Sequence, residues 1–170
     1  VEKTDIKGSD ITISWDGKDY QFRLPMPARH NISNFLAAAG MTLAGGLTIN
    51  EVLSAMQDFP GVPGRLNSVE TGQDFAVLID YAHTDDALER VLVTVRELTA
   101  RRVIVVFGCG GDRDSSKRPR MAGVASKYAD YIFVTNDNPR TESPAKIISE
   151  IMAGMTKSAD FVEVVPDRRE

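Results

Sequence analysis

Residues that could bind a charged ligand gather in three short polar segments, each of which follows an apolar run. The segments are residues 80–85, 108–114 and 135–140. Glycine lets the main chain approach a ligand closely. The guanidinium groups of Arg113 and Arg140 can each bind a carboxylate or a phosphate through two hydrogen bonds. The density of Asp, Asn, Arg and His in these segments predicts a binding site, and the alternative is that loops are simply polar.

The first polar segment offers two side chains with two interpretations each. Asp80 follows an apolar run, where a carboxylate commonly accepts a hydrogen bond from a sugar hydroxyl. The alternative is that Asp80 caps a helix that begins near Asp85. His83 could stack on a base or bond a phosphate, or it could cap the same turn.

Two asparagines lie three residues apart in a predicted helix, so Asn31 and Asn34 share a face. Side-chain amides both donate and accept hydrogen bonds, and two of them can read the edge of an adenine. The alternative is that they cap the helix, which accounts for Asn31 more easily than for Asn34.

Three other reactive or charged residues are predicted to have no role in binding or catalysis. The only cysteine, Cys109, is predicted to be a small buried residue, because no partnered base is evident. Arg118 and Arg120 are predicted to be solvated surface arginines. The glycine segment does not read G-x-G-x-x-G, and no G-x-x-x-x-G-K-[ST] occurs in the chain, so the dinucleotide fingerprint and the P-loop are both missing. A nicotinamide-dependent oxidoreductase is therefore disfavoured.

The elements that must position these residues change character along the chain. Apolar alternation on both sides of Asp16-Gly17 predicts a β-hairpin. Residues 32–43 follow as a predicted helix, and Thr48 with Glu51 forms a capping box for a second one. The Pro- and Gly-rich stretch 59–64 cannot continue a helix, so we expect a domain boundary there, with domains 1–62 and 63–170.

The second part alternates between strand and helix patterns. Continuous apolar runs predict four strands, at residues 75–79, 103–107, 131–134 and 161–165. Amphipathic helix patterns separate these runs, and Ser143-Pro144 opens the last of them. This alternation predicts an α/β fold with a mainly parallel sheet covered on both faces. The three polar segments should lie together at the carboxyl edge of that sheet, where such folds bind ligands.

Composition narrows the possible functions. The chain has 170 residues, 42% of them apolar, and a net charge of −4. The mild acidic excess argues against a nucleic-acid partner held through its phosphates. The sequence contains no run of 18 apolar residues, so no membrane span is predicted. A single cysteine excludes an internal disulfide framework. We expect a cytoplasmic protein.

Five motifs in order resemble the Mur ligase family of ATP-dependent amino-acid ligases. They are Arg29-His30-Asn31-Ile32-Ser33-Asn34, Pro63-Gly64-Arg65, Asp80-Tyr81-Ala82-His83-Thr84, Gly108-Cys109-Gly110-Gly111-Asp112-Arg113-Asp114 and Asp137-Asn138-Pro139-Arg140. The resemblance implies that residues 1–62 end a central ATP-binding domain and that residues 63–170 form most of a Rossmann-like C-terminal domain. It also implies a part of a longer enzyme, with the P-loop outside this chain.

The resemblance implies an activity and a set of small-molecule partners. The expected reaction joins meso-diaminopimelate to UDP-N-acetylmuramoyl-L-alanyl-D-glutamate through an acyl phosphate, in peptidoglycan precursor synthesis, with ATP consumed. Mg²⁺ would be needed, with its ligands outside this chain, and the piece alone should be inactive. The alternatives are a lysine-adding or folylpolyglutamate-type ligase and a non-catalytic binding module.

The resemblance also assigns residues to two ligands. Asn31, Asn34, Arg65, Asp80 and His83 would contact ATP, with Asn34 at the adenine, Arg65 at the phosphates and Asp80 at the ribose. Arg113, Asp137, Asn138 and Arg140 would bind the incoming amino acid, with Asp137 beside its amino group. Diaminopimelate carries one carboxylate more than lysine, and two arginines with an amide suit that group. Similar lysine-adding enzymes lack the arginine of Asp-Asn-Pro-Arg, so Arg140 favours diaminopimelate.

Overall fold

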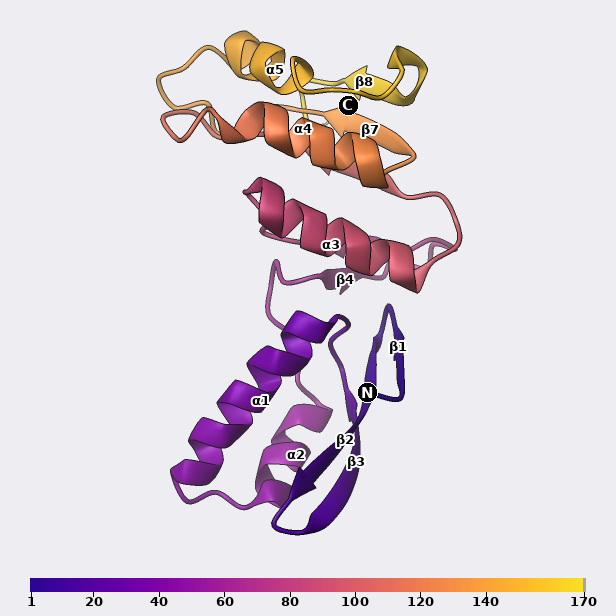
Figure 1. Ribbon diagram of the computed structural model, residues 1–170, viewed down its shortest axis with the longest axis vertical. Helices are drawn as coiled ribbons and strands as arrows, with labels where there is room; N and C mark the ends of the chain where they lie inside the picture. Colours follow the sequence, from indigo (N-terminus) through magenta and orange to yellow (C-terminus); the bar gives the residue numbers. More distant parts are fainter. Residues whose placement is uncertain (170) are drawn as a thin grey trace. The chain divides into compact units, whose positions relative to one another are not determined.

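A computed structural model describes residues 1–169 (Figure 1). The chain forms two compact units, Val1–Tyr81 and Ala82–Glu170. The units divide about twenty residues after the domain boundary predicted at residues 62 and 63, and that boundary stays a prediction. Each unit has its own group of buried apolar side chains.

The first unit begins with an antiparallel sheet of three strands in the order β1-β2-β3. Its strands are β1 (Lys3–Asp5), β2 (Gly8–Trp15) and β3 (Lys18–Leu24). Asp16 and Gly17 connect β2 to β3, and both have the positive φ that a two-residue hairpin turn requires, 49° and 71°. The predicted hairpin is therefore confirmed.

Two helices pack beside this sheet, α1 (Arg29–Ala44) and α2 (Ile49–Gln57) (Figure 1). The Thr48 hydroxyl accepts a hydrogen bond from the Glu51 amide, and the Glu51 carboxylate accepts one from the Thr48 amide, so the predicted capping box is confirmed. The helices and the hairpin share an apolar core. It includes Ile11, Phe22, Leu24, Ile32, Phe35 and Val52.

The last strands of the first unit correct one expectation. Residues 75–79 were expected to join the parallel sheet. The structure instead has β5 (Val77–Ile79) paired with β4 (Asn67–Val69), antiparallel, in a sheet of two strands. An apolar run predicts a strand, but it carries no information on which partner the strand pairs with.

The second unit contains the parallel sheet, with strands in the order β6-β7-β8. The strands are β6 (Ile104–Phe107), β7 (Tyr131–Val134) and β8 (Val162–Val164), close to three of the predicted runs. Three helices alternate with them: α3 (Asp85–Leu98), α4 (Lys117–Tyr128) and α5 (Pro144–Met152), with a short 3₁₀ turn, η1 (Ala159–Phe161), before β8. The predicted α/β fold with a parallel sheet is confirmed.

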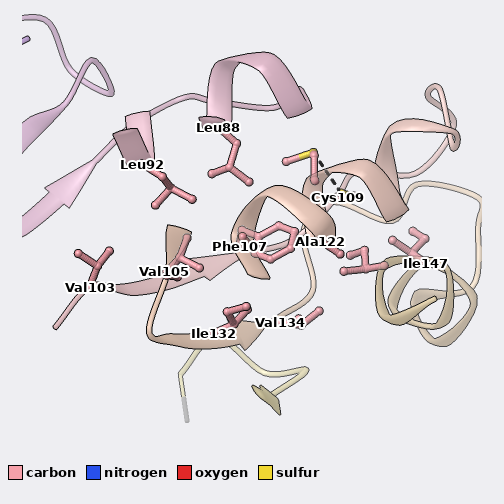
Figure 2. Packing of buried hydrophobic residues seen from close by; sticks show 14 residues of the cluster. Leu88, Leu92, Val103, Val105, Phe107, Cys109, Ala122, Ile132, Val134 and Ile147 are labelled. Atoms are coloured by element: carbon pink, nitrogen blue, oxygen red, sulfur yellow. Dashed lines mark hydrogen bonds between the residues drawn. The ribbon is translucent and has the colours of Figure 1, made fainter. Parts of the chain in front are cut away.

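All three helices lie against one face of the parallel sheet, and this is a second correction. Their apolar side chains form one core with the inward residues of the strands, as Figure 2 shows for Leu92, Val105, Ala122 and Ile132 among others. On the opposite face Ile104 and Val106 are 47% and 64% exposed. Coverage on both faces was expected from the apolar runs. Right-handed crossovers between strands that follow one another in one direction place α4 and α5 on the same side, so the strand order decides the side of these two helices.

Within residues 1–169, none of the helices is long and apolar enough to cross a membrane.

Candidate functional site

Two of the three polar segments come together in the second unit, where β6 and β7 end. The loop of residues 108–112, here the glycine loop, follows β6, and the loop of residues 135–142, here the Asp137 loop, follows β7. The Thr135 amide donates to the carbonyl of Phe107 at 3.0 Å, and the Gly111 amide donates to the carbonyl of Asn138 at 2.9 Å. The prediction of a shared edge is confirmed for these two segments, and the third follows β5 in another sheet.

The two loops approach each other so closely that glycine is required. A Cβ atom on Gly108 would lie 2.2 Å from the carbonyl oxygen of Thr135, and one on Gly111 would lie 1.8 Å from that of Pro139. Both separations are far below van der Waals contact, and main-chain oxygens cannot turn aside as a flexible side chain can. The glycines thus hold main chain against main chain.

Asn138 and Arg140 shape the Asp137 loop and tie it to the glycine loop. The side-chain oxygen of Asn138 accepts a hydrogen bond from the Arg140 amide, and Arg140 has a φ of 50°. The guanidinium of Arg140 donates to the carbonyl of Gly111 at 2.7 Å. Arg113 is exposed and donates to the carbonyl of its neighbour Asp112. Two guanidinium groups therefore extend from loops that are hydrogen-bonded to each other.

Asp137 has a cationic partner that the sequence did not indicate. Arg168 lies 3.2 Å from the Asp137 carboxylate and also donates to the carbonyl of Asn136 at 2.5 Å. The two residues line a shallow hollow of about 560 Å³, together with Asn136, Asn138, Pro166 and Asp167. Arg168 follows β8, so its place just beyond a carboxyl strand end is the signal that could have identified it.

Arg118 contradicts its assignment as a solvated surface residue. Its side chain is fully buried and bonds the carboxylates of Glu142 and Glu150. The helix period explains why Arg118 is buried, because it shares a face with Met121, Ala122 and Ala125, which are also buried. The charge of Arg118 favours a surface position, whereas the helix period indicates a buried one. Arg120 has a 56% exposed side chain beside Asp85 and Asp114, as expected.

The buried guanidinium dominates the electrostatics of the two loops. Arg118 and the amide of Asp112 both bond Glu142, and they lower the pKa of this carboxyl to about 2. The pKa of Arg118 is raised in turn, chiefly by Glu142 and then by Glu150, so the guanidinium stays charged. Cys109 is buried as predicted, and burial raises the pKa of its thiol. A raised thiol pKa speaks against a nucleophilic role.

In the first unit Arg65 comes just before β4 and Asp80 just after β5, at the same end of the two paired strands. The Asp80 carboxylate accepts a hydrogen bond from the Leu66 amide at 2.8 Å, and the Tyr81 amide donates to the carbonyl of Gly64. The guanidinium of Arg65 lies 6.0 Å from the centre of the Tyr81 ring. The capping role considered for Asp80 is wrong, because Thr84 occupies the N-cap and accepts from the Ala87 amide.

Asn31 and Asn34 share α1 but differ in their surroundings. Asn31 is 2% exposed and donates from its side chain to the carbonyl of Pro27, which lines a hollow of about 420 Å³ together with Arg65. Ala28 occupies the N-cap, so the capping role considered for Asn31 is wrong as well. Asn34 is exposed. In the second unit His83 is exposed, and its carbonyl accepts from the Lys117 ammonium at 2.6 Å.

Comparison with known proteins identifies the family. The family model described as "Mur ligase, glutamate ligase domain" matches residues 64–170. The chain belongs to the Mur ligase family. Two curated relatives, from Syntrophomonas wolfei and Geobacillus kaustophilus, are 46% and 42% identical over 99% of the chain. Both are named UDP-N-acetylmuramoyl-L-alanyl-D-glutamate–2,6-diaminopimelate ligase, and the chain spans about a third of their length, 35% and 36%.

Solved structures agree with this membership. A structure of UDP-N-acetylmuramoyl-L-alanyl-D-glutamate–2,6-diaminopimelate ligase matches 98% of the chain and 34% of its own, with 31% identity and a TM-score of 0.65. Folylpolyglutamate synthase from Mycobacterium tuberculosis, solved with ADP, matches 98% of the chain and 37% of its own, with 21% identity and a TM-score of 0.76. The second likeness shows a shared fold alone.

The His, Cys, Asp and Glu side chains of this Mur ligase chain are the residues that could bind a metal ion. Within the part of the chain that the structure describes, no group of three or more His, Cys, Asp or Glu side chains could hold a metal ion. The charged side chains of the two loops instead suit an organic ligand that carries both carboxylate and ammonium groups.

Proposed function

We propose that the protein containing this chain is an ATP-dependent ligase. It adds meso-diaminopimelate to UDP-N-acetylmuramoyl-L-alanyl-D-glutamate in peptidoglycan precursor synthesis in the cytoplasm. Membership of the Mur ligase family and the names of the relatives support this proposal. The chain contributes the subsite for the incoming amino acid and part of the surroundings of ATP. Its partners are these small molecules and the remaining domains of its own protein.

The observation that carries the proposal is the pairing of the glycine loop with the Asp137 loop. It brings Asn138 and Arg140 together in the loop that carries Asp137, and Arg113 directly follows the glycine loop. Guanidinium and amide groups suit the distal carboxylate of diaminopimelate, and the Asp137 carboxylate suits its ammonium group. Lysine has the same ammonium groups but lacks that carboxylate.

For ATP we propose contacts from Asn31, Asn34, Arg65, Asp80 and His83. Arg65 and Asp80 lie at the same end of the paired strands β4 and β5, which supports a joint role at the phosphates and the ribose. Asn34 and His83 are exposed, whereas Asn31 is buried and would act through the carbonyl of Pro27 that it binds. ATP supplies the phosphoryl group that activates the substrate carboxylate. Mg²⁺ would be held by residues outside this chain.

The test is a coupled assay of phosphate release by the full-length protein with ATP and the UDP-linked dipeptide. We expect turnover with meso-diaminopimelate and little with lysine or glutamate. Turnover with lysine or glutamate alone would support the lysine-adding or folylpolyglutamate-type alternative, and binding without turnover would support a non-catalytic module.

Replacing Arg140 tests its assignment. Losing a charged partner costs on the order of 2–5 kcal/mol, and the exposure of Arg140 favours the lower end. Arg140→Ala should therefore raise the KM for diaminopimelate about 30-fold and leave the KM for ATP within about twofold. Arg120→Ala is the matched control, because Arg120 is an exposed arginine that bonds neither loop carbonyl. Equal changes in both KM values would contradict the assignment.

A further inference from the structure

Arg118 is a fully buried cation that connects three parts of the second unit. From α4 it donates to the carbonyl of Gly110 in the glycine loop at 3.2 Å. It also binds both oxygens of Glu142, at 2.7 and 2.9 Å, and one oxygen of Glu150 in α5 at 2.5 Å. Its fork of donors is planar, so these contacts fix where the partners lie relative to one another.

Glu142 extends this arrangement to both loops. The same carboxylate oxygen that accepts from Arg118 accepts from the amide of Asp112 at 2.6 Å. The Asp112 carboxylate in turn accepts from the amide and the hydroxyl of Thr141, at 3.2 and 2.7 Å. A closed chain of hydrogen bonds thus runs from Arg118 through Glu142 and the glycine loop to the Asp137 loop.

Stability alone is a weak reason for a buried ion pair, because apolar residues of the same volume often serve a core equally well. Arg118 sits among Met121, Ala122 and Ala125, where a methionine would also pack. Its Nε atom is buried with no hydrogen-bond partner among residues 1–169, which adds to the cost of placing a charge there. What an apolar residue could not supply is a fixed orientation for Glu142 and Gly110.

We propose that Arg118, acting through Glu142, is a positioning residue for the amino-acid subsite. It holds Gly110 and Asp112 against the Asp137 loop, so that Asn138 and Arg140 are set for the incoming amino acid before it binds. This inference rests on the proposed function. Arg118 itself is buried, so its effect on the subsite passes through Glu142 and the two loops.

The two carboxylates that bind Arg118 provide a matched pair of variants. Glu142 bonds Arg118 and the glycine loop, whereas Glu150 bonds Arg118 and lies 3.9 Å from Lys146 on its own helix. Glu142→Gln and Glu150→Gln each remove one negative charge from the same guanidinium and keep the side-chain shape. If the role of Arg118 is purely structural, both variants should change binding and loop exchange to a similar extent. If Arg118 is a positioning residue, only Glu142→Gln should change them.

The kinetic measurement uses the full-length protein and compares the KM values for meso-diaminopimelate and ATP. A misplacement of about 1 Å at a binding group can cost about a hundredfold. Glu142→Gln should therefore raise the KM for diaminopimelate about tenfold to a hundredfold and leave the KM for ATP within about twofold. Glu150→Gln should change either value by less than about threefold. Arg118→Lys, which loses the fork, should behave like Glu142→Gln, with Arg120→Lys as its control.

A second measurement keeps the two proposals separable. Hydrogen exchange of the full-length protein reports directly on residues 108–112 and 135–142, whatever reaction the protein catalyses. We expect faster exchange in both loops for Glu142→Gln and unchanged exchange for Glu150→Gln. Equal exchange in the two variants, or equal rises in the KM values for both substrates, would overturn the positioning role. A wild-type protein without diaminopimelate-dependent turnover would refute the proposed function, and the exchange result would still decide the role of Arg118.

Discussion

Replacing Gly111 with alanine would test how the two loops are held together. The φ of Gly111 is not in the left-handed region, so alanine suits its backbone conformation and only the added methyl group matters. That methyl carbon would lie 1.8 Å from the carbonyl oxygen of Pro139, where ordinary contact begins at 3.4 Å. The difference means that one loop must move by about 1.6 Å.

The size of the effect follows from what such a movement breaks. The Gly111 amide is 2.9 Å from the carbonyl of Asn138, and the Gly111 carbonyl is 2.7 Å from the Arg140 guanidinium. Each lost hydrogen bond costs roughly 1 kcal/mol, and residual strain adds a similar amount. Gly111→Ala should therefore lower the free energy of unfolding by about 2–4 kcal/mol, a large part of the roughly 5–15 kcal/mol of a typical domain.

Urea denaturation followed by circular dichroism measures this loss, with a fall in the midpoint of about 1 M or more expected. Gly123→Ala is the matched control. Gly123 lies inside α4, where an added methyl group would meet the carbonyl oxygen of Gly154 at an ordinary 3.8 Å. In a helix interior alanine is favoured over glycine, so this variant should gain about 0.5–1 kcal/mol. Unchanged stability of Gly111→Ala would refute the close packing of the two loops.

Three further predictions concern acid, a helix cap and the thiol. The pKa of Glu142 is about 2 in the folded chain against an ordinary 4.5. The ionised carboxylate therefore stabilises the fold fully above pH 4.5, and this stabilisation is lost as the pH falls toward 2. In an acid titration followed by circular dichroism, Glu142→Gln should lack this part of the loss of stability. Thr48→Ala should cost about 1 kcal/mol in urea denaturation by removing the N-cap, and an unchanged midpoint would contradict the capping box. Cys109 should react slowly with a thiol reagent at pH 8 and quickly in urea, because burial both shields it and raises its pKa.

Local signals predicted the local structure of this chain. The Asp16-Gly17 turn and the Thr48 capping box depend only on residues within a few positions, and both are confirmed. Strand order is different, because it depends on pairings between distant segments. Residues 67–69 contain no apolar run that would indicate a strand, so the strand that pairs with β5 could not be predicted.

The candidate site was predictable to the extent that it lies in loops after strands. The segments after β6 and β7 were found because their polar residues follow apolar runs. Arg118 was misassigned because a charged residue is rarely buried, although its spacing to Met121 and Ala125 indicated the buried face. The roles of single residues toward ATP and the amino acid depend on ligand geometry and stay predictions.

The main chains of the glycine loop and the Asp137 loop lie in direct contact, here called the seam. This contact bears on how the proposed subsite could change the amino acid that it selects. Carbonyl oxygens of Thr135 and Pro139 occupy the space that side chains at positions 108 and 111 would fill, so the seam requires glycine at both positions. An exposed residue such as Arg113, whose side chain bonds only the carbonyl of its neighbour Asp112 among residues 1–169, can then be exchanged without moving its support. On this scaffold the proposed amino-acid subsite can acquire new selectivity by substitution at such a position, provided that Gly108 and Gly111 remain.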